Sequence, residues 1–314
     1  MRFSVIIPLY NKAPYVKKSI ESVLTQTNQD FELVIIDDGS TDDSFSIARS
    51  VLRSCKISYQ LIHQDNAGVS SARNHGVAAS KGEYLCFLDA DDWWAPSFLE
   101  RINEQIKDYP EAGIYGTNYY CVKNERQSVC VTTAHTGYIN YCRSYAEKLQ
   151  MPLWTGAVCI PRRVFNEIGG FRPQLKLGED FDLWIRISLK YKVAFLNEPL
   201  SYYNQDSDIS WRLIGKLHSP DAHMLWNLDY LSGYENTDPD YKKLVDGLRT
   251  YGLLPYYMSE QYRDMAKNEL RKVAWSEQPK RIRLLYKQPI IILRIRRVFL
   301  KCGSMIKQWI IKHI

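Results

Sequence analysis

The sequence lacks any hydrophobic run long enough to cross a membrane. Its longest purely aliphatic stretch is residues 290–293, whereas a membrane-spanning helix needs roughly 20 apolar residues. The sequence also begins without an apolar leader, because Met1 and Arg2 run directly into a stretch with the pattern of a strand. We therefore expect neither an integral membrane segment nor a signal peptide.

The sequence has no C-x-x-C pair, and its seven cysteines are an odd number. Both features argue against a disulfide framework and against a zinc ribbon. They favour a protein of the reducing cytosol. A chain of 314 residues can bury a large core without disulfides or metal. We expect ordinary core or surface thiols at Cys55, Cys86, Cys121, Cys130, Cys142, Cys159 and Cys302.

Acidic residues are absent from the end of the chain. The chain carries 41 Lys and Arg against 35 Asp and Glu, a net charge of +6. Ten of the basic residues and none of the acidic ones lie within residues 280–314. The apolar positions of this tail recur at helical spacing, which is typical of a basic amphipathic helix on an anionic membrane surface. The alternative is a helix packed on the protein. We expect no nucleic-acid partner, because no nucleic-acid motif accompanies the charge.

Strand-like and helix-like patterns alternate along the early part of the chain. The strand-like segments are residues 3–8, 33–36, 57–62 and 84–88, and helical patterns follow the first three. Alternation at this pitch predicts βαβ units around a mainly parallel sheet. Further along, strands are expected at 114–122, 130–133, 155–160 and 193–196, and helices at 162–168 and 179–191. After about residue 215 the pattern becomes helical and aromatic.

Acidic side chains and a tyrosine stand where three of these strands end. The residues are Pro8, Leu9, Tyr10 and Asn11 after the first strand, Asp37 and Asp38 after the second, and Asp89, Asp91 and Asp92 after the fourth. Ligands of such sheets bind beyond the carboxyl ends of the strands. Close carboxylates raise one another's pKa unless a cation offsets them. A hard divalent cation, shared with ligand phosphates, would do so. The alternative is a set of solvated loop acids.

Five motifs in this sequence occur together and in order. They are FSVIIPLYNK at residues 3–12, FELVIIDDGSTD at 31–42, NAGVSSARN at 66–74, the D-x-D element at 89–91 and G-E-D at 178–180. Together they resemble the family 2 glycosyltransferases over residues 1–210. The resemblance implies an α/β fold of the GT-A type, a nucleotide-binding fold with a central, mainly parallel sheet, and a helical C-terminal extension follows it. The expected divisions are a glycosyltransferase domain at 1–215, a helical extension at 216–280 and a basic amphipathic tail at 281–314.

The same resemblance implies roles for individual residues. Asp180 would be the general base that deprotonates the acceptor hydroxyl, and Asp91 would hold Mn²⁺ or Mg²⁺ against the diphosphate. Tyr10 would stack on the uracil, and Asp38 would accept the uracil N–H. The full set of expected donor-nucleotide contacts is Pro8, Tyr10, Asn11, Asp38, Arg73 and Asp89, where Asp89 touches the ribose or the metal.

Some of these residues have a second interpretation. Arg73 could contact the phosphates or Asp38, or it could form an ion pair within the acidic edge. Glu179 and Trp184 could face the acceptor, but Glu179 also suits the first turn of a helix and Trp184 also suits a core. Glu179 and Asp182 could raise the pKa of Asp180, which would tune it for its role as a base.

Two features depart from the family pattern. Many relatives carry a histidine metal ligand just after the strand that corresponds to residues 200–203, but residues 204–208 read NQDSD. Asp206 or Asp208 could replace that histidine. The R/Q-x-x-R-W signature of processive polysaccharide synthases is also absent. Its absence points to the transfer of a single sugar.

The function predicted by the resemblance is a metal-dependent, inverting transfer of one hexosyl or N-acetylhexosaminyl group from a UDP-sugar. The acceptor would be a glycan or a lipid-linked molecule, in surface polysaccharide or glycolipid assembly on the cytoplasmic face of the cell membrane. One alternative is a sugar-1-phosphate nucleotidyltransferase, although residues 9–14 contain no glycine for its phosphate loop. Another is a membrane-tethered nucleotide-binding scaffold without catalysis.

Overall fold

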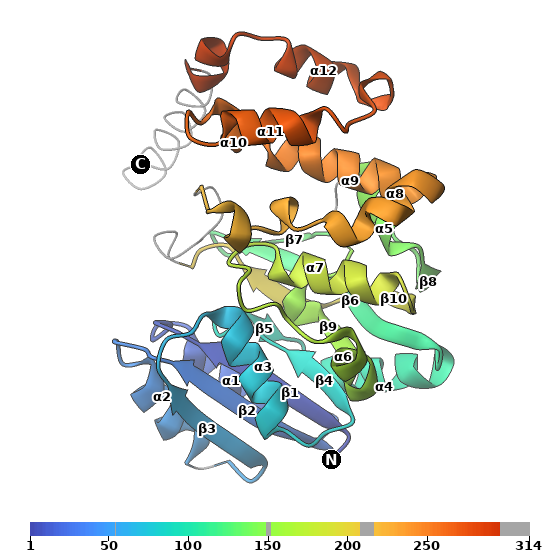
Figure 1. Cartoon of the computed structure of the whole chain (residues 1–314). Helices are drawn as coiled ribbons and strands as arrows, with labels where there is room; N and C mark the ends of the chain where they lie inside the picture. Colours follow the sequence, from blue (N-terminus) through green and yellow to red (C-terminus); the bar gives the residue numbers. More distant parts are fainter. Residues whose placement is uncertain (54, 149–151, 208–216, 296–314) are drawn as a thin grey trace. The chain divides into compact units, whose positions relative to one another are not determined.

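The computed structural model describes residues 1–53, 55–148, 152–207 and 217–295 of the chain (Figure 1). The chain divides into two compact units, Met1–Tyr230 and Leu231–Ile314. The predicted boundaries at residues 215 and 280 remain predictions, and most of the predicted basic tail lies outside the described residues. None of the helices in the described ranges has the length and hydropathy of a membrane-spanning segment.

A mixed, mainly parallel sheet forms the centre of the first unit (Figure 1). Its strand order is β3-β2-β1-β4-β9-β6-β10-β5, with β7 beside β6 and β8 beside β10. The strands are β1 (Phe3–Leu9), β2 (Phe31–Asp38), β3 (Ser58–Gln64), β4 (Tyr84–Phe87), β5 (Trp93–Trp94), β6 (Ala112–Lys123), β7 (Arg126–Val129), β8 (Gly137–Ile139), β9 (Val158–Pro161) and β10 (Lys192–Asn204). The first four pair in parallel, as predicted. β9 then runs antiparallel between β4 and β6.

Helices cover both faces of the parallel strands, which is why β1 and β2 are apolar at most positions. Along β2, Leu33 and Ile35 join a core cluster with α1 (Val16–Leu24), α2 (Ser44–Leu52) and α4 (Phe98–Asp108). Val34 and Ile36 pack on the other side with α3 (Val69–Ala79), because successive side chains of a strand alternate between its faces. The first unit also contains α5 (Tyr141–Lys148), α6 (Arg162–Ile168) and α7 (Glu179–Ser188).

The predicted strand at residues 130–133 is wrong. β6 instead pairs with β7 in a hairpin whose turn consists of Asn124 and Glu125. Both turn residues have positive φ angles, 48° and 63°. Two-residue hairpins favour this conformation because its twist matches that of the strands. The strand predicted at 155–160 also begins later, since a 3₁₀ turn at Thr155–Ala157 precedes β9.

One pair of cysteines also departs from expectation. A disulfide joins Cys121 in β6 to Cys130 just beyond β7, so the prediction of ordinary thiols is wrong for these two. The hairpin brings them together, since the Cys130 N–H donates to the Tyr119 carbonyl at 2.9 Å. The structure shows free thiols at Cys55, Cys86, Cys142 and Cys159, and Cys302 lies outside the described residues.

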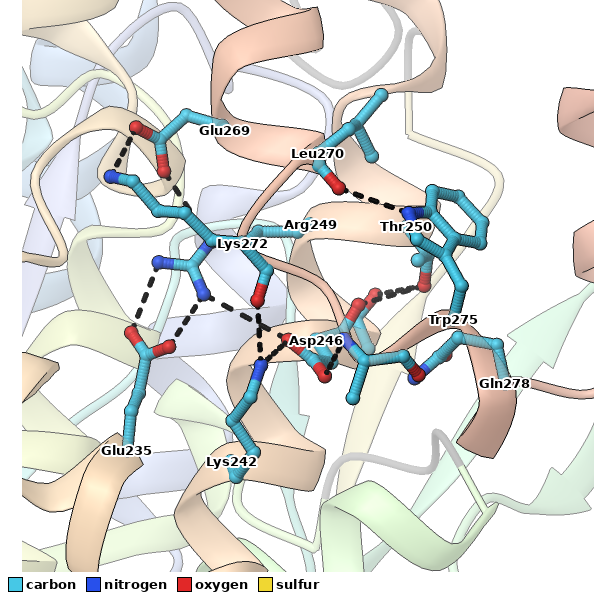
Figure 2. A network of polar contacts seen from close by, with 12 residues as sticks. Glu235, Lys242, Asp246, Arg249, Thr250, Glu269, Leu270, Lys272, Trp275 and Gln278 are labelled. Atoms are coloured by element: carbon cyan, nitrogen blue, oxygen red, sulfur yellow. Dashed lines mark hydrogen bonds and ion pairs between the residues drawn. The ribbon is translucent and has the colours of Figure 1, made fainter.

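Short helices form the second unit, as the helical pattern of this region predicts. They are α8 (Ser232–Thr237), α9 (Pro239–Gly252), α10 (Leu254–Met258), α11 (Arg263–Leu270) and α12 (Lys280–Tyr286). Figure 2 shows a polar network among them. The buried Asp246 pairs with Lys242 and accepts from the Ala274 N–H at 3.0 Å. The buried Arg249 donates to both carboxylate oxygens of Glu235, at 2.6 and 3.0 Å. These buried charges are paired, as burial requires, and the network ties α8 to α9.

Candidate active site

The carboxyl ends of β1, β2 and β4 meet at one edge of the sheet, as the order of the motifs predicts. β1 pairs with β2 on one side and with β4 on the other. The loops that follow these strands contact one another directly. The Asn11 N–H donates to the Ser40 hydroxyl at 3.1 Å, and Lys12 Nζ lies 2.6 Å from Asp91 Oδ2. The loops after β1, β2 and β4 therefore form one continuous rim.

The loop after β1 is anchored to the loop and helix that follow β2. Asn11 has a φ of 50°, a left-handed conformation that asparagine tolerates better than most residues. Its side-chain oxygen accepts from the Thr41 N–H at 2.8 Å, and the Lys12 N–H donates to the Ser44 hydroxyl at 2.7 Å. The half-buried Tyr10 directly precedes this anchored segment. Lys12 had no predicted role, because no sequence motif places it beside an acidic residue.

Asp38 is buried at the end of β2 and organises the loop that leads into α3. Its carboxylate accepts hydrogen bonds from Gln64 Nε2 at 2.7 Å, the Ala67 N–H at 2.8 Å and the Gly68 N–H at 2.9 Å. Two of these donors reach Oδ1 and one reaches Oδ2, so Oδ2 retains the capacity to accept a further hydrogen bond. The predicted bond from a uracil N–H would use that remaining capacity.

Arg73 of α3 links the D-x-D loop to the start of α7. Its side chain is buried, and it donates to Asp89 Oδ1 at 2.8 Å and to Glu179 Oε1 at 3.0 Å. The guanidinium carbon also lies 5.1 Å from the centre of the Phe171 ring. Of the contacts considered from the sequence, the structure shows the ion pair within the acidic edge rather than a contact with Asp38.

Asp180 lies in the first turn of α7. The backbone enters this helix through Gly178, whose φ of 80° is a conformation that other residues rarely adopt. The Asp180 carboxylate accepts from the Thr155 hydroxyl at 3.1 Å and from the Phe181 N–H at 2.7 Å. These two donors fix the orientation of the carboxylate that was predicted to be the general base.

Burial raises the pKa values of the two carboxyl groups at the start of α7, Glu179 and Asp180. It raises the pKa of Asp180, against the opposing charge of Arg73. Burial and the charge of Asp180 raise the pKa of Glu179 to about 7. Asp182, expected as a further influence on Asp180, is instead buried and pairs with Arg186 at 2.8 Å, which offsets its charge. The shift that suits a general base therefore comes from burial.

Trp184 lies in the core rather than on an acceptor surface. Its exposed fraction is 0%, and its ring packs edge to face on Phe171 with 6.2 Å between the ring centres. The structure thus corrects the predicted acceptor contact of this residue. The helical pattern could not decide the question, because Leu183, Trp184 and Ile185 are all buried and α7 is covered on more than one face.

Two residues without a predicted role, Trp154 and Thr155, complete the site together with Asp92. Trp154 is half-buried, and its ring centre lies 4.1 Å from that of Tyr203. Its Nε1 donates to Asp92 Oδ2 at 3.2 Å, and burial raises the pKa of Asp92 well above its ordinary value. Thr155, the next residue, donates to Asp180. An aromatic face therefore adjoins the candidate base. The available sequence signal was a tryptophan directly before a run of small residues.

The sequence model of glycosyl transferase family 2 matches residues 4–168. This chain belongs to that family. An uncharacterized glycosyltransferase of Rickettsia felis is 32% identical over 201 residues, which cover 64% of this chain and 32% of the relative. The chain thus matches about a third of the length of that curated relative.

Solved structures of other proteins share the fold of this family 2 chain. Residues 1–349 of Staphylococcus aureus TarS, in complex with UDP, give a TM-score of 0.69 at 16% identity, covering 90% of this chain and 82% of that one. The mannosyltransferase PcManGT of Pyrobaculum calidifontis, in complex with GDP-Man and Mn²⁺, gives 0.52 at 17% identity, covering 88% of each chain. These likenesses confirm the predicted α/β fold of the GT-A type.

A divalent metal in this family 2 site would need carboxylate ligands. Asp91 is already paired with a cationic side chain, because the Lys12 ammonium lies 2.6 Å from its Oδ2. Within the described part of the chain, no three His, Cys, Asp or Glu side chains form a ready-made metal group. Asp206 accepts from the Asn124 N–H at 2.6 Å, and Asp208 lies outside the described residues. The side chains fit a metal that one or two carboxylates share with substrate phosphates.

The raised pKa of Glu179 predicts a pH-dependent contribution to stability. Its pKa is about 7 in the folded protein against 4.5 for an ordinary glutamate, so the folded state binds more protons between these values. Stability therefore falls as pH rises from about 4.5 to about 7. We expect Glu179→Gln, which cannot ionise, to lose this decline of about 3 kcal/mol. Urea denaturation across this pH range would measure it. Parallel stability curves for wild type and variant would contradict the assignment.

Proposed function

We propose that this protein transfers one hexosyl or N-acetylhexosaminyl group from a UDP-sugar to an acceptor hydroxyl, with a metal ion and with inversion at the anomeric carbon. One observation carries the proposal: the two hydrogen bonds of Arg73 tie the D-x-D loop, through Asp89, to the start of α7, through Glu179. The candidate metal ligand Asp91 and the candidate base Asp180 thereby belong to one connected site. Membership of the family supports the same activity.

Asp180 would act as the general base. Thr155 and the Phe181 N–H orient its carboxylate. The carboxylate would accept the proton of the acceptor hydroxyl while the acceptor oxygen bonds to sugar C1 and the bond from C1 to the diphosphate breaks. Attack from the side opposite the leaving group would invert the anomeric carbon. The raised pKa makes Asp180 a stronger base than an exposed aspartate.

The D-x-D loop would stabilise the diphosphate leaving group. When bound, Mn²⁺ or Mg²⁺ would offset the negative charge that grows on the diphosphate. Asp91 would hold the ion, and Asp89, which Arg73 orients, would contact the ribose or the ion. The Mn²⁺ complex of PcManGT supports a metal in this fold.

The donor nucleotide would lie along the loops after β1 and β2. Tyr10 would stack on the base, Asp38 would accept a uracil N–H at Oδ2, and Pro8 and Asn11 would contact the nucleotide beside them. The complexes of TarS with UDP and with UDP-GlcNAc support a UDP-sugar. The complex of PcManGT with GDP-Man makes GDP-sugars the main alternative donor.

The acceptor would be a glycan or a lipid-linked molecule. Trp154 would offer its ring to an acceptor sugar, since flat apolar sugar faces stack on aromatic rings, and its centre lies 5.9 Å from the Tyr119 ring and 4.1 Å from the Tyr203 ring. Glu179 would lie beside the acceptor, because it directly precedes Asp180 in the sequence. Such an acceptor suits a role in surface polysaccharide or glycolipid assembly.

The end of the chain would bind the cytoplasmic face of an anionic membrane. Residues 290–295 are helical, and Ile291, Ile292 and Ile295 are exposed, which supports an apolar face on this segment. Arg294, one of the basic residues of this tail, instead donates to the Met258 carbonyl at 2.9 and 2.8 Å. Membrane binding would therefore depend on the other basic residues of the tail.

Turnover tests this function and separates it from its two alternatives. The full chain would be incubated with Mn²⁺, a panel of UDP-sugars and a glycan acceptor, and UDP release and the anomeric configuration of the product would be measured. Inverted product with UDP release supports the proposal. A nucleotidyltransferase would not release UDP in this mixture; it would form a UDP-sugar from UTP and a sugar 1-phosphate in a parallel assay, with pyrophosphate as the leaving group. A silent scaffold would bind nucleotide without turnover in either assay. Retained configuration would exclude the proposed single attack.

A further inference from the structure

Lys12 forms an ion pair with Asp91, the carboxylate that is proposed to bind the metal. Lys12 Nζ lies 2.6 Å from Asp91 Oδ2, and the exposed fractions of the two side chains are 21% and 15%. The neighbouring Asp89 is paired in the same way, with Arg73 at 2.8 Å. Both acids of the D-x-D element therefore carry internal counter-charges.

The position of Lys12 follows from the anchored loop after β1. Its backbone N–H donates to the Ser44 hydroxyl at 2.7 Å, and the next residue, Ala13, donates to Asp42 Oδ2 at 3.1 Å. The lysine side chain then reaches from the β1 loop to the β4 loop. Because its backbone is anchored at the start of α2, its ammonium group reaches Asp91.

We propose that Lys12 is an internal counter-cation that competes with a divalent metal for Asp91, so that tight metal binding requires a nucleoside diphosphate. The inference rests on the proposed function, in which Asp91 is the metal ligand. Two cations on one carboxylate repel each other, and among the described residues no group of three His, Cys, Asp or Glu side chains converges there to overcome that repulsion. A diphosphate changes the balance, because its oxygens accept the three N–H donors of the lysine and also supply metal ligands.

Lys12 would therefore act twice. Without nucleotide it keeps Asp91 neutralised and metal binding weak. With nucleotide its ammonium moves from Asp91 to the diphosphate and adds positive charge beside the leaving group. Removal of the Lys12 charge should therefore strengthen metal binding without nucleotide and weaken nucleotide binding with metal. We expect Lys12→Met to bind metal alone about tenfold more tightly, and to bind UDP in the presence of metal about tenfold more weakly.

Mn²⁺ titration followed by electron paramagnetic resonance, with and without UDP, tests this inference on the full chain. Lys12→Arg keeps the charge and should bind Mn²⁺ alone as weakly as the wild type. Lys17→Met is the matched control, because Lys17 is an exposed lysine of α1 that pairs only with the exposed Glu21 among the described residues; it should behave as wild type. Circular dichroism would verify that each variant is folded.

The outcomes separate this inference from the proposed function. Tighter binding of Mn²⁺ alone by Lys12→Met, with weaker binding of UDP, supports the role of Lys12. If wild type binds Mn²⁺ tightly only with UDP but Lys12→Met binds Mn²⁺ alone no more tightly, the role of Lys12 is wrong and the metal site stands. If wild type binds no Mn²⁺ even with UDP, the proposed metal-dependent function fails, and the inference fails with it.

Discussion

Replacement of Asp180 by asparagine is expected to lower kcat by about 10²–10⁴-fold, the usual contribution of a positioned general base. Asparagine has nearly the same shape and can still accept the hydrogen bond of Thr155, but it cannot take the proton of the acceptor hydroxyl. Binding of UDP with Mn²⁺ should be unchanged, because Asp180 does not lie in the loops proposed to hold the nucleotide. UDP release measures kcat, and calorimetry measures binding.

The main test of this prediction is whether Asp180→Asn lowers turnover without weakening UDP binding. Asp91→Asn should lose both turnover and metal-dependent UDP binding, whereas Asp180→Asn should lose turnover alone. An Asp180→Asn variant that retains more than about a tenth of the wild-type kcat would contradict the assignment of the general base. Loss of nucleotide binding in that variant would indicate a structural role for Asp180 instead.

Replacement of Arg73 by methionine is expected to lower the free energy of unfolding by about 3–5 kcal/mol. The buried guanidinium holds Asp89 at 2.8 Å and Glu179 at 3.0 Å, so its loss leaves two crowded carboxylates without a partner. Its charge also opposes the rise in the pKa of Glu179. Without it Glu179 will protonate more readily, and the destabilisation should be smaller at pH 5 than at pH 8. Urea denaturation at the two pH values would show this.

The control for this prediction is a second arginine with two acidic partners. Arg101 pairs with Glu198 and with Glu104, but its side chain is 36% exposed. Arg101→Met should therefore lower stability by only about 0–1 kcal/mol. An Arg73→Met variant no less stable than Arg101→Met would show that Arg73 does not hold the site together.

The parallel sheet could be predicted because its physical signature is local. β1 is buried at every position, and a strand covered on both faces has a nearly continuous apolar sequence. The acids at the ends of β2 and β4 follow from the same pattern, since the carboxyl ends of neighbouring parallel strands share one edge. The fold and the clustering of these strand-end residues at one edge of the sheet could therefore be predicted from short segments.

The contacts within the site could not be predicted because they join distant segments. Arg73 and Glu179 are 106 positions apart, and Lys12 and Asp91 are 79 apart, so no local pattern chooses these partners. The disulfide between Cys121 and Cys130 joins residues only 9 positions apart, but it depends on a hairpin whose second strand was predicted at 130–133. That strand was misplaced because the turn at 124–125 lacks the glycine that commonly marks one.

The most direct test of the account is equilibrium binding of UDP, GDP, dTDP and CMP, with and without Mn²⁺, to wild type and to Asp91→Asn. It requires no knowledge of the acceptor. The account predicts Mn²⁺-dependent binding of UDP by wild type and its loss in Asp91→Asn. The same pattern with another nucleotide would keep the site and change the donor. Absence of metal-dependent binding of any of these nucleotides, by protein shown to be folded, would contradict the account.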